Sequence, residues 1–124
     1  MSQNQDYFPD PNNRPTFLQK AGVESTILTG FGQDRMMMVL TRIDPGIMVA
    51  EHSHPEEQIG VCYGGKARMH IGGIEKIVEK GDFIYIPSDI PHDAEGLGDK
   101  PFFMVDIFSP IREDLLDKLK KEQK

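Results

Sequence analysis

The chain has 124 residues, no tryptophan and a single cysteine, Cys62. One thiol cannot form an intramolecular disulfide, so we expect a protein of a reducing compartment, the cytoplasm. No apolar run approaches the roughly 20 residues that a membrane span needs. The start, residues 1–6, has neither the basic region nor the apolar run of a signal peptide. These absences argue against secreted and membrane-spanning proteins.

Basic charge is also in short supply. The chain carries 14 Lys and Arg against 20 Asp and Glu, a formal net charge of -6. An acidic chain repels phosphate backbones and anionic membrane surfaces. One lysine cluster, at positions 118, 120, 121 and 124, is interleaved with Asp117 and Glu122, which indicates a solvated helix end. We therefore expect neither nucleic acid nor membrane as a partner.

The length fits one domain with its own core. Residues 1–15 are polar and carry Pro9, Pro11 and Pro15, which predicts an N-terminal arm outside the central sheets. Residues 16–124 then form the domain. Short apolar or alternating runs, separated by Gly, Pro and Asp turns, predict an antiparallel all-β sandwich or barrel. The expected strands are 25–28, 36–43, 47–52, 58–63, 66–71, 74–78, 83–86 and 102–108.

Specific turn and capping residues separate these runs. Gly64-Gly65 and Gly72-Gly73 stand where two tight hairpins are expected to close. A C-terminal helix is expected from about residue 110, with Ser109 as its cap and Pro110 in its first position. One apolar stripe and two ion pairs at i, i+4 support it: Ile111, Leu115 and Leu119, then Asp114/Lys118 and Asp117/Lys121.

Three of the four histidines gather in two segments. His52 and His54 are two residues apart in an expected strand, so their imidazoles point the same way, and His92 follows a Gly-Asp turn and a strand. Such a set is a metal site in outline. By the same alternation, Gln58, Gly60 and Cys62 share the interior with the histidines, while Asp106 interrupts an apolar strand and needs a partner or a role.

These residues resemble the two motifs of the cupin family, small jelly-roll β-barrels. The first is matched by Gly46, His52, His54, Gln58 and Gly65, and the second by Gly81, Pro87 and His92. The resemblance implies one divalent metal ion, and the N and O donors suit Ni, Zn, Fe or Mn. Gln58 stands where many members have a glutamate, so the ligands are neutral and the cation keeps its full charge as a Lewis acid. Asp89 and Gly96 also depart from the second motif.

Within that family, residues 52–58 and 106–114 resemble the pectin-degradation cupins, which linearise 4,5-unsaturated uronates to 5-keto-4-deoxyuronates. This resemblance implies a metal on His52, His54, Gln58 and His92, with catalytic-pocket residues at Asp106, Phe108 and Arg112. Ile111 replaces a proline usual there. The chemistry is coherent, because Arg112 suits a substrate carboxylate and a buried Asp106 suits acid/base catalysis.

Plainer interpretations stand beside these. Gln58 could be a hydrogen-bond partner of the ligands, Asp106 a structural carboxylate held by Arg112 or backbone amides, Arg112 an exposed helix residue, and Phe108 core packing. His70 lies outside both motifs, where a surface or cross-strand role is expected. Met36, Met37 and Met38 alternate faces and cannot converge on one copper ion. Cys62 is expected to be a small buried side chain.

Three functions compete. The leading one is a metal-dependent enzyme acting on an unsaturated uronate or a related small anionic sugar. The alternatives are an Fe-dependent oxygenase, which would consume O₂, and a non-catalytic metal- or sugar-binding module, which would bind without product. A homodimer is expected, formed through an edge strand or the N-terminal arm, since two-fold dimers are the commonest assembly.

Overall fold

The computed structural model describes residues 6–122, so the first five residues of the predicted arm, and Lys124 of the lysine cluster, lie outside it. A short 3-10 helix, η1, spans Pro11–Asn13, and α1 spans Glu113–Glu122. The strands are β1 Thr16–Lys20, β2 Val23–Thr29, β3 Met37–Ile43, β4 Met48–His52, β5 Glu57–Gly64, β6 Lys66–Ile71, β7 Ile74–Glu79, β8 Phe83–Ile86, β9 His92–Leu97 and β10 Phe102–Ser109.

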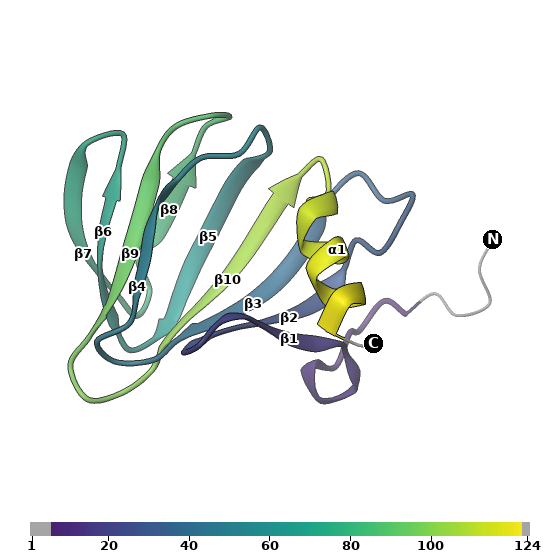
Figure 1. The fold of residues 1–124 in the computed structure, drawn as a ribbon, viewed down its shortest axis with the longest axis horizontal. Helices are drawn as coiled ribbons and strands as arrows, with labels where there is room; N and C mark the ends of the chain where they lie inside the picture. The colour runs from purple at the N-terminus through teal and green to yellow at the C-terminus, as the bar shows by residue number, and fades with distance from the viewer. Residues whose placement is uncertain (1–5, 123–124) are drawn as a thin grey trace.

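Two antiparallel sheets face each other (Figure 1). One has six strands in the order β1-β2-β3-β10-β5-β8, and the other has four in the order β4-β9-β6-β7. The predicted all-β fold with a short C-terminal helix is confirmed. All the predicted strands form, with ends no more than two residues from the expected positions.

Two strands, β9 and β1, were not predicted from the sequence. The β9 segment His-Asp-Ala-Glu-Gly-Leu contains no β-branched residue, yet it pairs with β4 on one side and β6 on the other. Its place in the sheet comes from backbone pairing on both edges, which outweighs its weak strand propensity. Strand β1 is short and pairs only with β2, with Phe17 as its one buried residue.

The two glycine pairs behave differently. Gly72 and Gly73 close the β6–β7 hairpin with φ of 57° and 82°, next to the paired Ile71 and Ile74, as predicted. The hairpin expected at Gly64-Gly65 is wrong, because β5 and β6 belong to different sheets and the chain crosses between them there. Gly65 is needed at this crossover, since a Cβ built on it would lie 2.1 Å from the backbone oxygen of Pro101.

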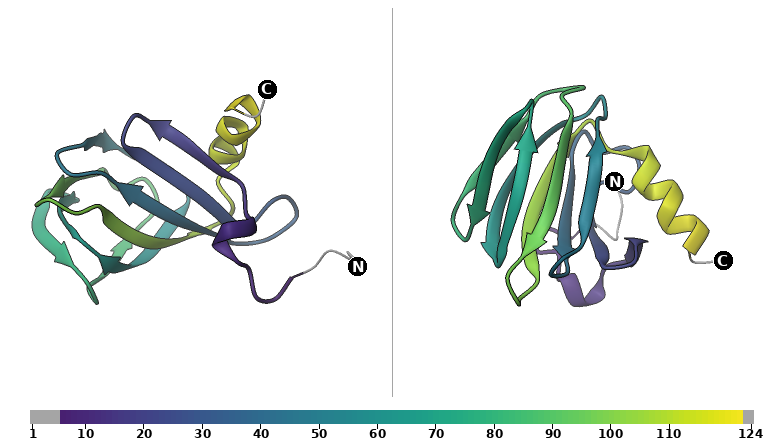
Figure 2. Two further views of the ribbon diagram at one scale, coloured as in Figure 1. Left: turned by 90° about the horizontal axis from the view of Figure 1, so that it is seen from below. Right: turned by 60° about the vertical axis from the view of Figure 1, so that its left-hand side comes forward.

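The core lies on the inner face of the six-stranded sheet and has two parts. Beneath the four-stranded sheet, one cluster includes Ile43, Ile84, Ile86, Phe102 and Met104. Beneath α1, a second cluster joins Phe17, Ile27, Met37, Val39 and Phe108 to the helix. Figure 1 shows β10 between these two covers, and Figure 2 shows α1 standing apart from the four-stranded sheet in both views. The inner face of β10 therefore contributes to both clusters, with Phe102 and Met104 in the first and Phe108 in the second.

The helix begins later than predicted. Ser109 is still part of β10 and its hydroxyl donates to the backbone oxygen of Arg35, so it cannot cap the helix, and Pro110 lies before the first turn. The predicted apolar stripe is confirmed, since Ile111, Leu115 and Leu119 are buried together with Leu116. Nothing in residues 6–122 is a helix long and apolar enough to cross a bilayer.

Candidate metal centre

The three motif histidines meet at the mouth between the sheets. His52 ends β4 and His92 begins β9, directly opposite each other in the register of these strands. His54 was expected on the same strand as His52, but β4 ends at His52 and His54 lies in the following loop. The rings nevertheless converge, with centroids 4.4 Å apart for His52 and His92, 4.9 Å for His54 and His92, and 5.9 Å for His52 and His54.

Backbone carbonyls fix how each ring presents itself. Nδ1 of His52 lies 2.9 Å from the oxygen of Ala50, Nδ1 of His54 lies 2.9 Å from that of Glu56, and Nδ1 of His92 lies 2.8 Å from that of Ile90. A carbonyl only accepts, so Nδ1 carries the hydrogen and Nε2 of the neutral ring keeps a free lone pair.

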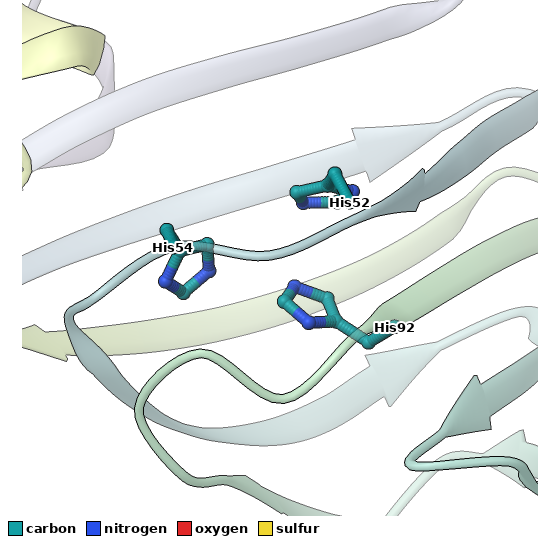
Figure 3. A group of neighbouring side chains, drawn as sticks. All are labelled: His52, His54 and His92. Atoms are coloured by element: carbon teal, nitrogen blue, oxygen red, sulfur yellow. The ribbon is translucent and has the colours of Figure 1, made fainter.

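One nitrogen from each histidine lies within 4.8 Å of the others, around the space seen in Figure 3. Burial lowers the pKa of His54, and burial lowers that of His92 to about 4. Both rings are therefore neutral near pH 7, the state in which imidazole binds metals. His52, His54 and His92 together could hold a metal ion.

Gln58 supplies an observation that tests this fit. Its Nε2 donates to Oδ1 of Asp106 at 2.9 Å, which leaves Oε1 facing Nε2 of His54 at 3.2 Å. With Nδ1 of His54 carrying the hydrogen, the two facing atoms are both acceptors, a pairing that is unfavourable unless a cation lies beside them. The donor set of three imidazoles and one amide oxygen suits a divalent first-row metal.

Asp106 is buried on the inner face of β10, opposite Gly60 in the register with β5. Burial raises its pKa to about 6, although hydrogen bonds from Gln58 and from the Thr41 hydroxyl, each 2.9 Å long, favour the ionised form. These side chains satisfy the carboxylate, in place of the Arg112 or backbone amides of the structural alternative. A Cβ on Gly60 would lie 2.8 Å from Oδ1, so the glycine leaves space for the carboxylate.

Arg112 precedes α1 and is buried, so the plainer alternative of an exposed helix residue is wrong. Its guanidinium carbon lies 5.0 Å from the ring centroid of Phe108, and Phe108 in turn meets His54 edge-on at 5.6 Å. Asp114 accepts from Nε and Nη2 of Arg112 at 3.2 and 2.6 Å, which uses one edge of the fork and leaves the end of the guanidinium unengaged by Asp114. Neither of the two i, i+4 ion pairs predicted for the helix lies within salt-bridge distance, and Asp114 pairs instead with Arg112.

One cavity brings these groups together. Its lining includes His52, His92, Gln58, Asp106, Phe108 and Arg112, and also Gln19 and Thr41, which sequence reasoning missed. Thr41 lies on β3, which pairs with β10, and Gln19 lies on the unpredicted β1. Only the three-dimensional pairing of these strands brings them to the site.

The remaining candidates lie elsewhere. His70 bonds across strands to Asp93 and Glu75, as expected for a residue outside the motifs. Met36 is exposed and Met37 is buried, so the methionine run does alternate faces. Cys62 is buried and its thiol donates to the oxygen of Gly64.

Residues 39–108 match the cupin domain family. The chain belongs to the cupin family. The cupin fold extends over most of the chain: KdgF from a Halomonas species is 23% identical, with a TM-score of 0.80 over 90% of this chain and 99% of its own. An RmlC-like cupin from Shewanella frigidimarina is also 23% identical, with a TM-score of 0.78 over 92% of this chain and 99% of its own.

A curated relative of this cupin is the H2HPP isomerase of Bacillus subtilis. The two are 30% identical over 71 residues, which are 56% of this chain and 30% of the isomerase. The match therefore spans less than a third of the isomerase's length. With KdgF and the RmlC-like cupin, this chain shares the cupin fold.

Proposed function

We propose that this cupin is a metal-dependent enzyme that converts 4,5-unsaturated uronate monomers, or a related small anionic sugar, to the linear keto form. One observation carries the proposal. A buried acid, Asp106, accepts a hydrogen bond from Gln58, whose amide oxygen faces His54 of the histidine cluster. Asp106 and Gln58 line one cavity together with His52 and His92. An acid/base group beside a site for a Lewis acid is the equipment that ring opening requires.

His52, His54, His92 and Gln58 are the proposed holders of the ion, with Ni, Zn, Fe or Mn as candidates. All four donors are neutral, so a divalent cation bound there would supply undiminished Lewis acidity toward a sugar oxygen. Gln58 is oriented for this, because its amide nitrogen donates to Asp106 and its amide oxygen faces His54.

The proposed reaction is an isomerisation and needs no co-reactant. The hydroxyl proton at the hemiacetal carbon leaves, the bond from that carbon to the ring oxygen breaks to give an aldehyde and an enolate, and the enolate takes one proton on carbon to become a ketone. Asp106 is the proposed carrier of the proton, because a carboxyl with a pKa of about 6 can both accept and return one near neutrality. Thr41 and Gln58 hold its two oxygens in place meanwhile.

Arg112 and Phe108 are proposed to bind and orient the substrate. The end of the guanidinium that Asp114 does not engage can receive the sugar carboxylate, while Asp114 fixes the plane of the group. The Arg112 guanidinium lies over the Phe108 ring, and the Phe108 ring packs edge-on against His54. Phe108 is therefore in contact with both the proposed anion-binding group and a proposed metal ligand. Its packing role in the core is part of the same arrangement.

The relation to an H2HPP isomerase supports an isomerisation more than an oxygenase reaction, within the 71 residues that match. Proton carriage by Asp106 would have no evident part in a non-catalytic binding module. An Fe-dependent oxygenase and a binding module are the outcomes to be separated by experiment.

The test is the loss of ultraviolet absorbance of freshly generated 4,5-unsaturated galacturonate, followed with metal-loaded protein against the spontaneous rate. Asp106→Asn, which keeps the size of the side chain, is the matched variant, and its metal content and fold are measured alongside. Acceleration that is lost in the variant, at unchanged metal content, would support the proposal. No acceleration by folded, metal-replete protein would reject it, and O₂ uptake with iron-loaded protein would then indicate the oxygenase.

A further inference from the structure

The outward face of the six-stranded sheet carries large apolar side chains where a solvated face is usually polar. Phe83 is 79% exposed, Tyr85 55%, Ile59 50% and Tyr63 41%. Phe83 and Tyr85 project from β8 at one edge of the sheet, and Ile59 and Tyr63 project from the neighbouring β5.

These side chains continue across the sheet as one band. Register places Tyr85 beside Ile59 and Phe83 beside Val61, then Val61 beside Val105 and Ile59 beside Ile107. The next strand, β3, adds Leu40 beside Val105 and Met38 beside Ile107. We call this set the sheet-face band: Met38, Leu40, Ile59, Val61, Tyr63, Phe83, Tyr85, Phe103, Val105 and Ile107. None of its members is charged, while Arg42 and Glu57 lie at its border, where Arg42 pairs with Phe103 in the register and Glu57 accepts from the Tyr85 hydroxyl. Tyr63 stacks on Phe103 with ring centroids 5.3 Å apart.

The size of the band decides what it can do. An aromatic side chain presents about 150–250 Å² when fully exposed, so the four most exposed residues alone leave on the order of 400 Å² open. That is already as large as the largest apolar patch of a typical monomer, about 300–600 Å². With the partly exposed aliphatic residues beside them, the band approaches the ~800 Å² per partner of a standard interface.

We propose that the sheet-face band is the contact surface between two copies of this chain, related by a two-fold axis. The whole chain carries a formal charge of -6, so two copies repel over most of their surfaces and meet most favourably where charge is absent. Among the described N-terminal residues, Pro11 and Asn12 line a surface pocket together with the band residues Leu40, Tyr63 and Phe103. This differs from pairing through an edge strand or the arm, and it does not depend on the proposed function.

The test is sedimentation equilibrium of the full chain across a range of protein concentrations. Phe83→Glu is expected to raise the dimer dissociation constant by roughly 30-fold or more, as for a buried anchor residue. Ile74→Glu is the matched control, because Ile74 is 76% exposed on β7 of the other sheet. Circular dichroism of both variants checks that they fold. A monomeric wild type, or a dimer that survives Phe83→Glu, would overturn the proposal.

A second inference rests on a separate observation, the buried carboxylate of Glu56 beside Nδ1 of His54. Oε1 of Glu56 is buried and has no hydrogen-bond partner in the described part of the chain, and it lies 3.6 Å from Nδ1 of His54. Nδ1 of His54 already donates to the backbone oxygen of Glu56 at 2.9 Å. A carboxylate oxygen that is buried without a partner destabilises the fold unless another favourable interaction offsets the cost of burying it.

We infer that Glu56 is a positioning residue, whose carboxylate stabilises His54 when a cation is bound to the opposite nitrogen. This rests on the proposed metal site. The three imidazoles and the Gln58 amide carry no negative charge. The carboxylates of Glu56, beside His54, and of Asp106, beside Gln58, can therefore offset the charge of the cation. Carboxylates behind ligating histidines typically contribute 10–100-fold to metal affinity.

Glu56→Gln is the test, with Glu51→Gln as the control that makes the same charge change at an exposed neighbour of His52. Competition with a chromophoric chelator for Zn²⁺ is expected to show affinity lower by roughly 10–100-fold in Glu56→Gln and nearly unchanged in Glu51→Gln. Unfolding of the metal-free proteins is expected to show no loss of stability, since Oε1 has no partner to lose.

The two failures are distinguishable. Wild-type protein that binds no Zn²⁺ would remove the metal site itself. Wild type that binds while Glu56→Gln binds equally well, or loses affinity only in proportion to metal-free stability, would overturn the role of Glu56 alone.

Discussion

The side-chain amide of Gln58 donates to Asp106 across strands β5 and β10 at 2.9 Å. This bond couples the acid to the candidate metal centre and sets the direction in which the Gln58 oxygen points. It also gives a physical reason for an amide at this position. A carboxylate there would face a second carboxylate in a buried pocket.

Gln58→Glu is therefore expected to lower the stability of the metal-free protein at neutral pH by about 1–3 kcal/mol, because a buried acceptor loses its donor and gains a like charge. The same change is expected to tighten metal binding, since the introduced carboxylate is an anionic ligand. Urea unfolding and chelator competition measure the two effects. Adding Asp106→Asn restores a donor and should recover the stability, and equal stability of the single variant and wild type would contradict this account.

Gly60→Ala tests the space beside Asp106. The added methyl would lie 2.8 Å from Oδ1 of Asp106 and 2.9 Å from the sulfur of Met104, so these groups must move. Overpacking of this kind costs about 1–3 kcal/mol, and we expect a lower Tm together with reduced turnover. Gly32→Ala is the control, because a methyl there meets nothing within 4 Å. An equal Tm change in both variants would argue against the close packing around Asp106.

Asp114→Asn tests whether Arg112 needs its partner. Although burial raises the pKa of Asp114, the hydrogen bond and charge of Arg112 lower it overall, so the two groups form an ion pair. Solvent-exposed ion pairs contribute about 0.2–1 kcal/mol, so KM for the uronate is expected to rise by roughly 1.4- to fivefold with kcat little changed. Asp117→Asn, on the exposed side of the same helix, should leave KM unchanged. A matching rise in both variants would point to bulk charge instead.

His70 is expected to make stability depend on pH. Its hydrogen bond with Asp93, together with the one with Glu75, raises its pKa above the ordinary 6.5. The folded state therefore binds the proton more tightly, which stabilises it below about pH 6.5, and this contribution disappears as the pH rises through the folded pKa. The difference in unfolding free energy between wild type and His70→Gln should be larger at acidic than at alkaline pH. A difference that does not vary with pH would contradict the assignment.

Much of the candidate site could be predicted from the sequence, because successive side chains of a strand point to opposite faces of the sheet. The positions of Gln58, Gly60 and Asp106 on inner faces follow from the two-residue period, and the register of β5 with β10 brings them together. The period fails where strands end. His54 lies beyond β4, and its position depends on the turn at Pro55 and on the hydrogen bond from Asp89 to its backbone oxygen.

Other features required the folded chain. The crossing between sheets at Gly65 has the same local signature as a hairpin, since both need a positive φ, and only the pairing of β5 and β6 with different partners separates them. Strand β9 lacks the residues that favour strands and forms through its two neighbours. The isolation of the Glu56 carboxylate depends on burial, which no spacing encodes.

The candidate ligands come from both sheets. His52 and His92 belong to β4 and β9 of the four-stranded sheet, whereas Gln58 belongs to β5 of the six-stranded sheet. A single ion held by all of them would fasten the two walls of the barrel together at their rim, as a removable cross-link. Removing the ion should then leave the core beneath the four-stranded sheet intact, while amide hydrogens near residues 52–58 exchange faster and the loop after β4 is cleaved faster by proteases.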